Sequence, residues 1–404
     1  MQKWTWLIAL VAGCGDNLIE QPKPPESQPF AESAHGTPPQ LVSEGGPVLT
    51  APRTQPIFWS TDADYQAKIE DFDTKLATYD YWETTTSEYG VGYLKALPSI
   101  VTTDPVPTTN AALTAWLAQK LDGTHTAEGW PAEIDPQTIY SVFLPPGAVL
   151  HDPGGDSCAA YGAFHDEAMG AHGESIIYAL MPRCNYGGPL IDDLTASYSH
   201  ELIEAATDPL VETDLAYGDP DPDNYVMGYT PGAETGDYCE YLDTAYIRLE
   251  GYEVQRTWSN KASLAGKDPC VPALKDTAYI AAVPMYGAQA PIDDVYTGAK
   301  LMTQGLAVPV GQTATLEIQL ISDRATGPFT VTAVDSSQFY GGSTELAFSW
   351  DSTTGKNGDV LHLTVTRKKA GQLPGSEFML QTNAGTGAAA AKQAASQWWG
   401  YIGN

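Results

Sequence analysis

The chain has 404 residues, of which 50 are acidic and 20 are basic, so its formal net charge at pH 7 is −30. A surface this acidic repels nucleic acid and anionic membranes, which excludes nucleic acid as a partner. With 43% hydrophobic residues the chain is not disordered, and its length predicts two folded domains with tails. The 38 Gly, 30 Pro and 22 Tyr favour a loop-rich fold with strands over a helix bundle.

The first residues have the pattern of an export signal. Lys3 supplies a positive charge, residues 4–11 are a short apolar run, and the segment VAGC ends at Cys14. Residues 1–14 therefore resemble a bacterial lipoprotein signal peptide, in which Cys14 is lipidated. The alternative is an ordinary signal peptide that contains a cysteine. We expect an exported bacterial lipoprotein at the outer membrane or cell surface, held to the membrane only by this lipid, because the apolar run is too short to span a bilayer.

Residues 15–45 are rich in Pro, Ser, Glu and Gln and lack an apolar period, so we expect a disordered tether. A folded domain is expected from residue 46 to residue 272. Apolar runs predict buried strands at 55–59, 138–144, 175–181 and 252–258. Helical spacing of apolar residues predicts helices at 65–79 and 113–121.

The segment SHELIEAATDP, residues 199–209, carries the chemistry of this domain. His200, Glu204 and Asp208 recur every fourth residue, so on a helix they share one broad face. A His-Glu pair followed one turn later by another ligand is typical of a helical zinc site, with His200 as ligand and Glu201 as general base on a water held by the metal. Glu204 stands where a second histidine is usual, but a carboxylate oxygen also binds zinc. Pro209 ends the helix.

One helix cannot surround a metal ion, so other ligands must come from elsewhere. Glu234 and Asp237, in a loop that contains glycine, are expected to complete the shell, with Asp208 as a further candidate. Zinc is the expected metal and calcium the alternative. His165 is a candidate to orient substrate or stabilise an oxyanion; the alternative is a half-buried histidine bonded to backbone. A solvated helix beside an acidic loop would explain the same residues without a metal.

Besides Cys14 the chain has four cysteines, and an even number in an exported protein predicts disulfides. Three pairings are possible. Sequential pairing, Cys158–Cys184 and Cys239–Cys270, closes two loops of similar length and is our prediction. Zinc ligation by these thiols is disfavoured because no two of them are close in sequence.

The second half of the chain has a different pattern. Residues 273–300 are expected to be a linker, 301–382 a small all-β sandwich and 383–404 a tail, in which the Ala-rich segment 386–396 could be helical. Alternating segments at 314–320, 329–333, 346–350 and 360–365 predict the strands of the sandwich. The predicted fold class is α+β: a zincin-like α/β domain with a mixed sheet and a central metal-site helix, followed by the sandwich.

The first domain resembles the phosphate-induced (exordium-like) protein family, specifically its bacterial secreted relatives. The resemblance covers residues 45–272 and rests on the order of these segments: 45–50 (GGPVLT), 56–59 (PIFW), 88–92 (EYGVG), 142–147 (VFLPPG), 158–165, 199–209, 234–239 and 254–260 (VQRTWSN). Plant members are extracellular, growth-linked proteins that lack the His-Glu pair, whereas many bacterial relatives keep it with a downstream acidic Gly-Asp-x-Cys segment. No catalytic activity is established for the family. The resemblance therefore implies an extracellular metal-site domain and leaves hydrolysis to be inferred from the motif.

Two functions follow from these patterns. The first is a zinc-dependent hydrolase of the metallopeptidase kind, acting on a peptide or a cell-surface polymer. The carboxylate-rich ligand shell makes the metal a weaker Lewis acid and argues against high activity. The alternative is a non-catalytic extracellular binding or adhesion module whose metal is structural. In either case we expect a monomer.

Overall fold

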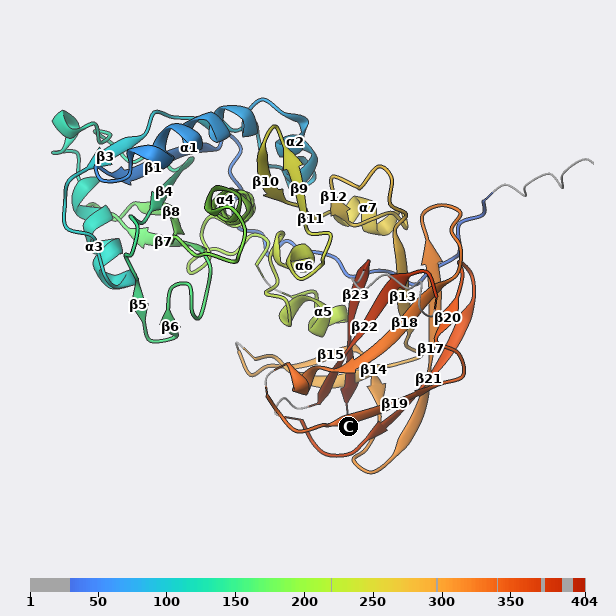
Figure 1. Cartoon of the computed structure of the whole chain (residues 1–404). Helices are drawn as coiled ribbons and strands as arrows, with labels where there is room; N and C mark the ends of the chain where they lie inside the picture. Colours follow the sequence, from blue (N-terminus) through green and yellow to red (C-terminus); the bar gives the residue numbers. More distant parts are fainter. Residues whose placement is uncertain are drawn as a thin grey trace, which may run out of the picture. The chain divides into compact units, whose positions relative to one another are not determined.

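The computed structural model describes residues 30–218, 220–295, 297–339, 341–371, 375–386 and 395–403 (Figure 1). The predicted signal peptide, the lipidation site Cys14, residues 15–29 of the predicted tether and most of the Ala-rich segment lie outside these ranges. From Glu32 onward the chain forms one compact unit. Within the described ranges, every helix is too short or too polar to cross a membrane.

A mixed sheet forms the centre of the first domain. Its strand order is β2-β1-β4-β8-β7, and β3 also pairs with β1. The bounds are β1 (Arg53–Trp59), β2 (Lys95–Ala96), β3 (Ile100–Thr102), β4 (Thr138–Phe143), β7 (Phe164–Met169) and β8 (Ser175–Met181). The central strands β1, β4 and β8 run parallel, and β7 lies antiparallel to β8 at the edge. Parallel strands covered on both faces are apolar throughout, which is why 138–143 and 175–181 could be predicted.

Helices cover both faces of this sheet. Phe58, Phe143 and Tyr198 belong to one core, which also holds the buried faces of α1 (Ala63–Leu76), α2 (Asp80–Thr86) and α4 (Leu190–Thr207). Tyr140 and Val142 point to the opposite face, where they join the core under α3 (Asn110–Lys120). Neighbouring residues of one strand thus enter different cores, as the two-residue period of a strand requires. The helix α4 is held between the sheet and β10.

Short elements connect the sheet to the rest of the unit. They are η1 (Ser87–Tyr89), η2 (Thr126–Glu128), β5 (His151–Asp152), β6 (Gly155–Asp156), η3 (Pro222–Asn224), α5 (Tyr225–Tyr229), α6 (Asp237–Glu240), β9 (Tyr246–Leu249), β10 (Tyr252–Gln255), β11 (Thr257–Trp258), α7 (Asn260–Leu264) and β12 (Cys270–Val271). The hairpin β9–β10 packs along α4, and α6 lies against β11. The segment between α4 and β12 therefore wraps the central helix and positions the loop that precedes α6.

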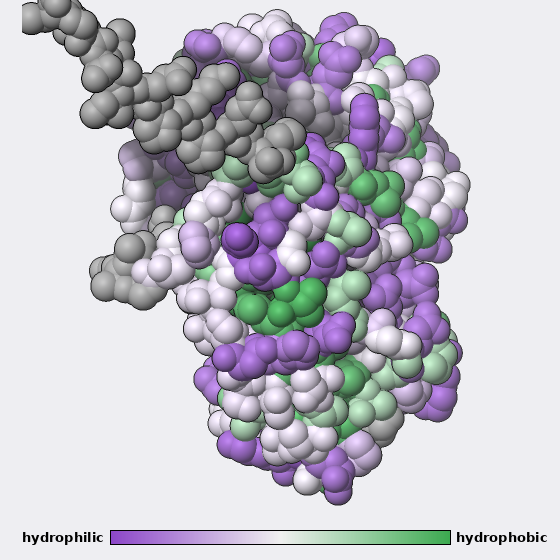
Figure 2. All heavy atoms as spheres, turned by 90° about the vertical axis from the view of Figure 1, so that its right-hand side faces the viewer, coloured by the Kyte–Doolittle hydropathy of each residue, from purple (hydrophilic) through white to green (hydrophobic). Residues whose placement is uncertain are grey.

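Two largely antiparallel sheets form the second half, and the short strand β16 pairs with β23 in parallel. One has the order β13-β17-β21-β19 and the other β16-β23-β22-β18-β20. The bounds are β13 (Ile280–Met285), β16 (Leu306–Ala307), β17 (Thr313–Ser322), β18 (Phe329–Asp335), η4 (Ser336–Gln338), β19 (Leu346–Trp350), β20 (Thr354–Gly355), β21 (Val360–Arg367), β22 (Ser376–Ala384) and β23 (Ser396–Gly403). Ile318 and Leu363 from one sheet share a core with Phe378 and Ile402 from the other. On the face drawn in Figure 2, hydrophobic residues form small patches between hydrophilic ones.

The predicted α+β class with a β-sandwich is confirmed, but three boundaries are wrong. The predicted linker 273–300 contains β13, an edge strand of the sandwich, and β14 (Gln289–Asp293), which forms a hairpin with β15 (Lys300–Gln304). The predicted tail 383–404 contributes β23, which pairs with β22. Within the predicted tether, Leu41 is buried, and its backbone exchanges two 2.8 Å hydrogen bonds with the Asn260 side chain. The Asn260 side chain makes the two backbone hydrogen bonds that a neighbouring strand would otherwise make, so this polar, proline-rich segment is ordered at Leu41.

Candidate metal centre

The helix α4 brings three predicted residues to one place. His200, Glu201 and Glu204 lie in its last two turns and are 9%, 5% and 2% exposed. Such burial is unusual for carboxylates unless they are paired or bind a cation. The helix ends at Thr207, where the backbone N–H of Asp208 donates to Glu204 O at 2.7 Å and Pro209 follows. The predicted helix and its end are confirmed.

A first group of ligand atoms comes from His200, Glu204 and Asp237. His200 Nε2 lies 2.8 Å from Glu204 Oε2 and 3.7 Å from Asp237 Oδ1, and the three ligand atoms all lie within 4.8 Å of one another. Two ligands of a tetrahedral zinc ion, each about 2.1 Å from the metal, are separated by about 3.4 Å. The observed distances bracket this value, so the three side chains fit one ion with little movement.

The loop before α6 fixes this arrangement. Gly236 N donates to Glu204 Oε1 at 2.8 Å, and Gln255 Nε2 donates to Gly236 O at 2.9 Å. Asp237 Oδ2 accepts from the backbone of Glu234 at 3.1 Å, which leaves Oδ1 on the side of His200. A Cβ atom at position 236 would lie 2.6 Å from His200 Nδ1. The loop can approach the helix this closely only because residue 236 has no side chain.

A second group of ligand atoms comes from His165, Glu204 and Glu234. His165 Nδ1 lies 3.4 Å from Glu201 Oε2 and 3.8 Å from Glu204 Oε2, and its Nε2 lies 3.3 Å from Glu234 Oε1. The His165 side chain is only 3% exposed. The sequence makes His165 a candidate to orient substrate or stabilise an oxyanion, with a half-buried histidine bonded to backbone as the alternative. In the structure its Nε2 lies 3.3 Å from the backbone oxygen of Asp208, as in that alternative, and the side chain also lies among three carboxylates, a position suited to a ligand or to a group that orients ligands.

Strand register places His165 on the side of α4. It pairs with Ala179 of β8, and Ala179 belongs to the core that α4 shares. Residues directly opposite in antiparallel strands point to the same face of the sheet. Residues 164–169 (FHDEAM) do not alternate between apolar and polar side chains, so only the pairing of β7 with β8 shows which face His165 occupies.

The two groups create a strong local field. Burial raises the pKa of Glu204 to about 7; the charge of His200 opposes this shift and that of Glu234 adds to it. Burial also raises the pKa of Asp237 well above its usual range, and Glu204 adds to that shift. Burial alone would lower the pKa of His200 and His165, but Glu204 beside His200 and Glu234 beside His165 raise both instead. Carboxylates crowded in this way are stabilised by a bound cation.

Asp208 is placed differently from the prediction. Its Oδ1 accepts from the backbone of Ala216 at 2.7 Å. Among the residues that the structure describes, Asp208 belongs to neither group of ligand atoms. Its carboxylate fastens the loop that follows α4, and its carbonyl oxygen lies 3.3 Å from His165 Nε2. Its role is therefore to hold the loop and His165 in place.

An acidic cleft of about 600 Å³ opens onto the first group. Its described lining contains no lysine or arginine. The carboxylates that line it are Asp193, Glu201, Asp237, Glu240 and Glu253, and the tyrosines are Tyr161, Tyr186, Tyr241 and Tyr246. Three of these tyrosines, Tyr186, Tyr241 and Tyr246, are substantially exposed. The cleft thus combines negative charge with aromatic surface at its mouth.

Both predicted disulfides, Cys158–Cys184 and Cys239–Cys270, are present. The first joins the segment before β7 to the segment after β8, next to Gly162 and Tyr186 of the cleft wall. The second joins α6, which begins with the candidate ligand Asp237, to β12. The sequential pairing therefore fastens the loops on either side of the centre.

No protein-family model matches the chain, and no curated protein matches it. The resemblance to the exordium-like family stays a prediction based on the order of its segments.

Proposed function

We propose that this protein is a zinc-dependent hydrolase whose metal ion is held by His200, Glu204 and Asp237. The observation that carries the proposal is the meeting of an imidazole, the buried carboxylate of Glu204 and the half-buried carboxylate of Asp237, with ligand atoms within 4.8 Å of one another, at an open cleft that His200 and Asp237 line. A histidine ligand favours zinc over calcium or magnesium, which take oxygen ligands. His165 and Glu234 support these ligands from behind.

Zinc, when bound, lowers the pKa of a water molecule at an open coordination position towards neutrality. Glu201 supplies the base for this chemistry. It lines the cleft, follows the ligand His200 in sequence and has its Oε2 3.4 Å from His165 Nδ1. A carboxylate in that place can take a proton from the attacking water and pass it to the leaving group. His165 acts as a positioning residue for Glu201.

The substrate class we propose is an extended, cationic peptide segment. Residues 160–163 line the cleft and lead directly into β7, whose outer edge is unpaired in the described sheet. An extended chain can add to such an edge through backbone hydrogen bonds. Five carboxylates and four tyrosines favour lysine or arginine side chains by charge and by cation–π contact.

The alternative is a binding module with a structural metal. The burial of Glu204, at 2% exposed, and the carboxylate-rich shell favour it, because both reduce the metal's Lewis acidity and access. The zinc-binding residues would be the same in both cases, so metal content alone does not separate the two functions. The effect of replacing Glu201 on hydrolysis does separate them.

The test compares the full chain with Glu201→Gln, using Glu212→Gln, an exposed position, as the matched control. Each purified protein is loaded with zinc and mixed with peptide libraries rich in lysine and arginine or rich in glutamate. We expect Glu201→Gln to keep zinc and to lose hydrolysis by at least about 100-fold, and the basic library to be cleaved faster. Equal hydrolysis by Glu201→Gln contradicts the mechanism; bound zinc without hydrolysis of either library supports the binding module.

We further propose that the protein is exported and belongs with the bacterial secreted relatives of the exordium-like family. The two disulfides support export, because such bonds persist in oxidising compartments.

A further inference from the structure

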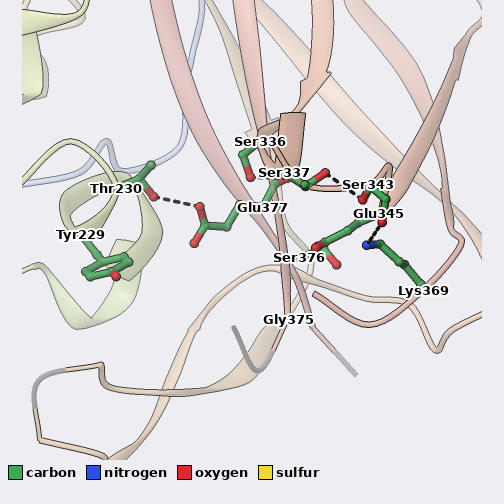
Figure 3. Close-up of a pocket in the computed structure, with 11 residues that line it drawn as sticks. Tyr229, Thr230, Ser336, Ser337, Ser343, Glu345, Lys369, Gly375, Ser376 and Glu377 are labelled. Atoms are coloured by element: carbon green, nitrogen blue, oxygen red, sulfur yellow. Dashed lines mark hydrogen bonds between the residues drawn. The ribbon is translucent and has the colours of Figure 1, made fainter. Parts of the chain in front are cut away.

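A second cavity, of about 470 Å³, lies where α5 meets η4 and β22 (Figure 3). It shares no described lining residue with the acidic cleft. Six of its eleven described lining residues carry a hydroxyl group, three are charged and two are glycines. With no aliphatic side chain among them, this lining does not suit an apolar ligand.

Glu377 is the most informative residue in this cavity. It is 6% exposed, and its Oε2 accepts from Thr230 Oγ1 at 3.2 Å. Its other oxygen, Oε1, is buried and has no hydrogen-bond partner among the described residues, and neither has the buried Oγ of Ser376 beside it. Burial raises the pKa of Glu377 to about 7, and the charge of Glu345 adds to the shift. Buried polar atoms without partners are costly, so a ligand that satisfies them gains affinity.

The walls of the cavity are fixed in place. Ser336 Oγ donates to Glu377 O at 3.0 Å, which joins η4 to β22. Asp335 accepts from Ser337 N at 3.1 Å and from Glu345 N at 2.6 Å, so both ends of the 336–345 loop are tied to one carboxylate. These hydrogen bonds hold the described part of the wall in one arrangement, which lowers the entropy that binding costs.

We propose that this cavity binds a saccharide, whose hydroxyl groups donate to Glu377 Oε1 and accept from Ser376 Oγ. The cavity contains two buried carboxylates, Glu345 and Glu377, and one ammonium group, that of Lys369, whose Nζ donates to Ser343 Oγ. Because charges of both signs are present, the cavity suits a neutral, hydroxyl-rich ligand better than a cation. The Tyr229 ring, which stacks on Tyr225 with its centroid 5.7 Å away, adds an aromatic group to the lining at the α5 side (Figure 3). This binding site does not depend on the metal centre.

The experiment titrates the full chain with cellotriose, chitotriose, xylotriose and maltotriose by calorimetry, and follows Tm at saturating concentrations. We expect at least one trisaccharide to bind and to raise Tm, and its affinity to fall at least about tenfold in Glu377→Gln, one lost charge-assisted hydrogen bond. Ser376→Ala, which removes only a hydroxyl group, must weaken binding in the same direction.

Two controls isolate the cavity. Glu317 is exposed on β17, and Glu317→Gln must leave the affinity for the trisaccharide unchanged. The metal-site variant Glu201→Gln must also leave that affinity unchanged. Without ligand, Glu377→Gln must melt at or above the wild-type Tm, because a buried carboxylate has been removed. Binding of none of the four trisaccharides, or equal binding by wild type and Glu377→Gln, overturns the proposal. Binding of spermidine instead, lost in Glu377→Gln, identifies a cation site and also overturns it.

Discussion

Gly236 and Glu204 are joined by a 2.8 Å hydrogen bond from the backbone N–H to Oε1, which leaves Oε2 of the carboxylate 2.8 Å from His200 Nε2. Gly236 has φ −79° and ψ −39°, a conformation open to any residue. Space, not backbone freedom, requires glycine here, because a Cβ atom would lie 2.6 Å from His200 Nδ1 and 2.8 Å from Glu204 Oε1.

Gly236→Ala should therefore displace His200 or Glu204 and weaken zinc binding by about 10–100-fold, the usual effect of disturbing the groups that orient metal ligands. Zinc titration with a competing chelator measures this. The control is Gly154→Ala, an exposed position where a Cβ would meet no atom within 4 Å. Unchanged zinc affinity in Gly236→Ala would show that the loop and helix do not form the ligand set described.

His165→Ala tests how the two groups of ligand atoms are used. If His165 positions Glu201 and Glu234, the variant should keep one equivalent of zinc, bind it more weakly by about 10–100-fold, and lose most hydrolysis. The exposed His172→Ala is the matched control. A wild type that binds two equivalents, reduced to one in His165→Ala, would instead show that His165, Glu204 and Glu234 bind an ion of their own.

Asp73 predicts a pH effect on stability. It is 1% exposed in α1, and burial raises its pKa well above the usual value. The folded state therefore keeps a proton on Asp73 that the unfolded chain releases near pH 4. Protonated Asp73 makes its full contribution to the free energy of unfolding below about pH 4, and this contribution is lost as the pH rises through the pKa of the folded state. Asp73→Asn should raise the free energy of unfolding at pH 8 by about 1–3 kcal/mol, and by less at pH 4.

Asp71, two residues earlier on the same helix, is the control with the opposite sign. Its hydrogen bonds with Lys75 and Tyr252 lower its pKa, so Asp71→Asn should slightly reduce stability at pH 8. Urea unfolding at both pH values measures the two variants. An Asp73→Asn variant that is less stable at pH 8 would contradict the assignment.

The Cys239–Cys270 disulfide links stability to the metal centre. It closes a separation of 31 residues, and replacing both cysteines by alanine should lower the free energy of unfolding by roughly 3.5 kcal/mol. Urea unfolding with chelator present separates this loss from the effect of metal. Since α6 carries Asp237, zinc should also bind more weakly; full zinc affinity in the double variant would show that α6 needs no covalent anchor.

Much of the first domain could be predicted because its signals are local. The strand at 175–181 is a continuous apolar run, and the helix that carries His200 and Glu204 places them one turn apart whatever surrounds it. The sequence could not show which other residues join His200 and Glu204 at the metal centre. His165 joins the centre through the pairing of β7 with β8, and Asp208 turns towards Ala216, which are both consequences of long-range packing.

The sandwich boundaries were missed for physical reasons. In β13, residues 280–284 are buried, so the segment does not alternate, and Pro284 argues against a strand. Proline is tolerated there because β13 lies at the edge of its sheet. The strand β23 follows an Ala-rich segment and shows its role only through its pairing with β22. Leu41 in the predicted tether is ordered by the Asn260 side chain, a contact that composition cannot reveal.

The most direct test of the metal centre is the zinc content of the purified protein, measured by elemental analysis beside His200→Ala and His172→Ala. We predict about one equivalent of zinc in the wild type and in His172→Ala, as for a zinc site with three protein ligands and one open position, and almost none in His200→Ala. Calcium in place of zinc, no bound metal, or the same zinc content in His200→Ala would contradict the proposed centre.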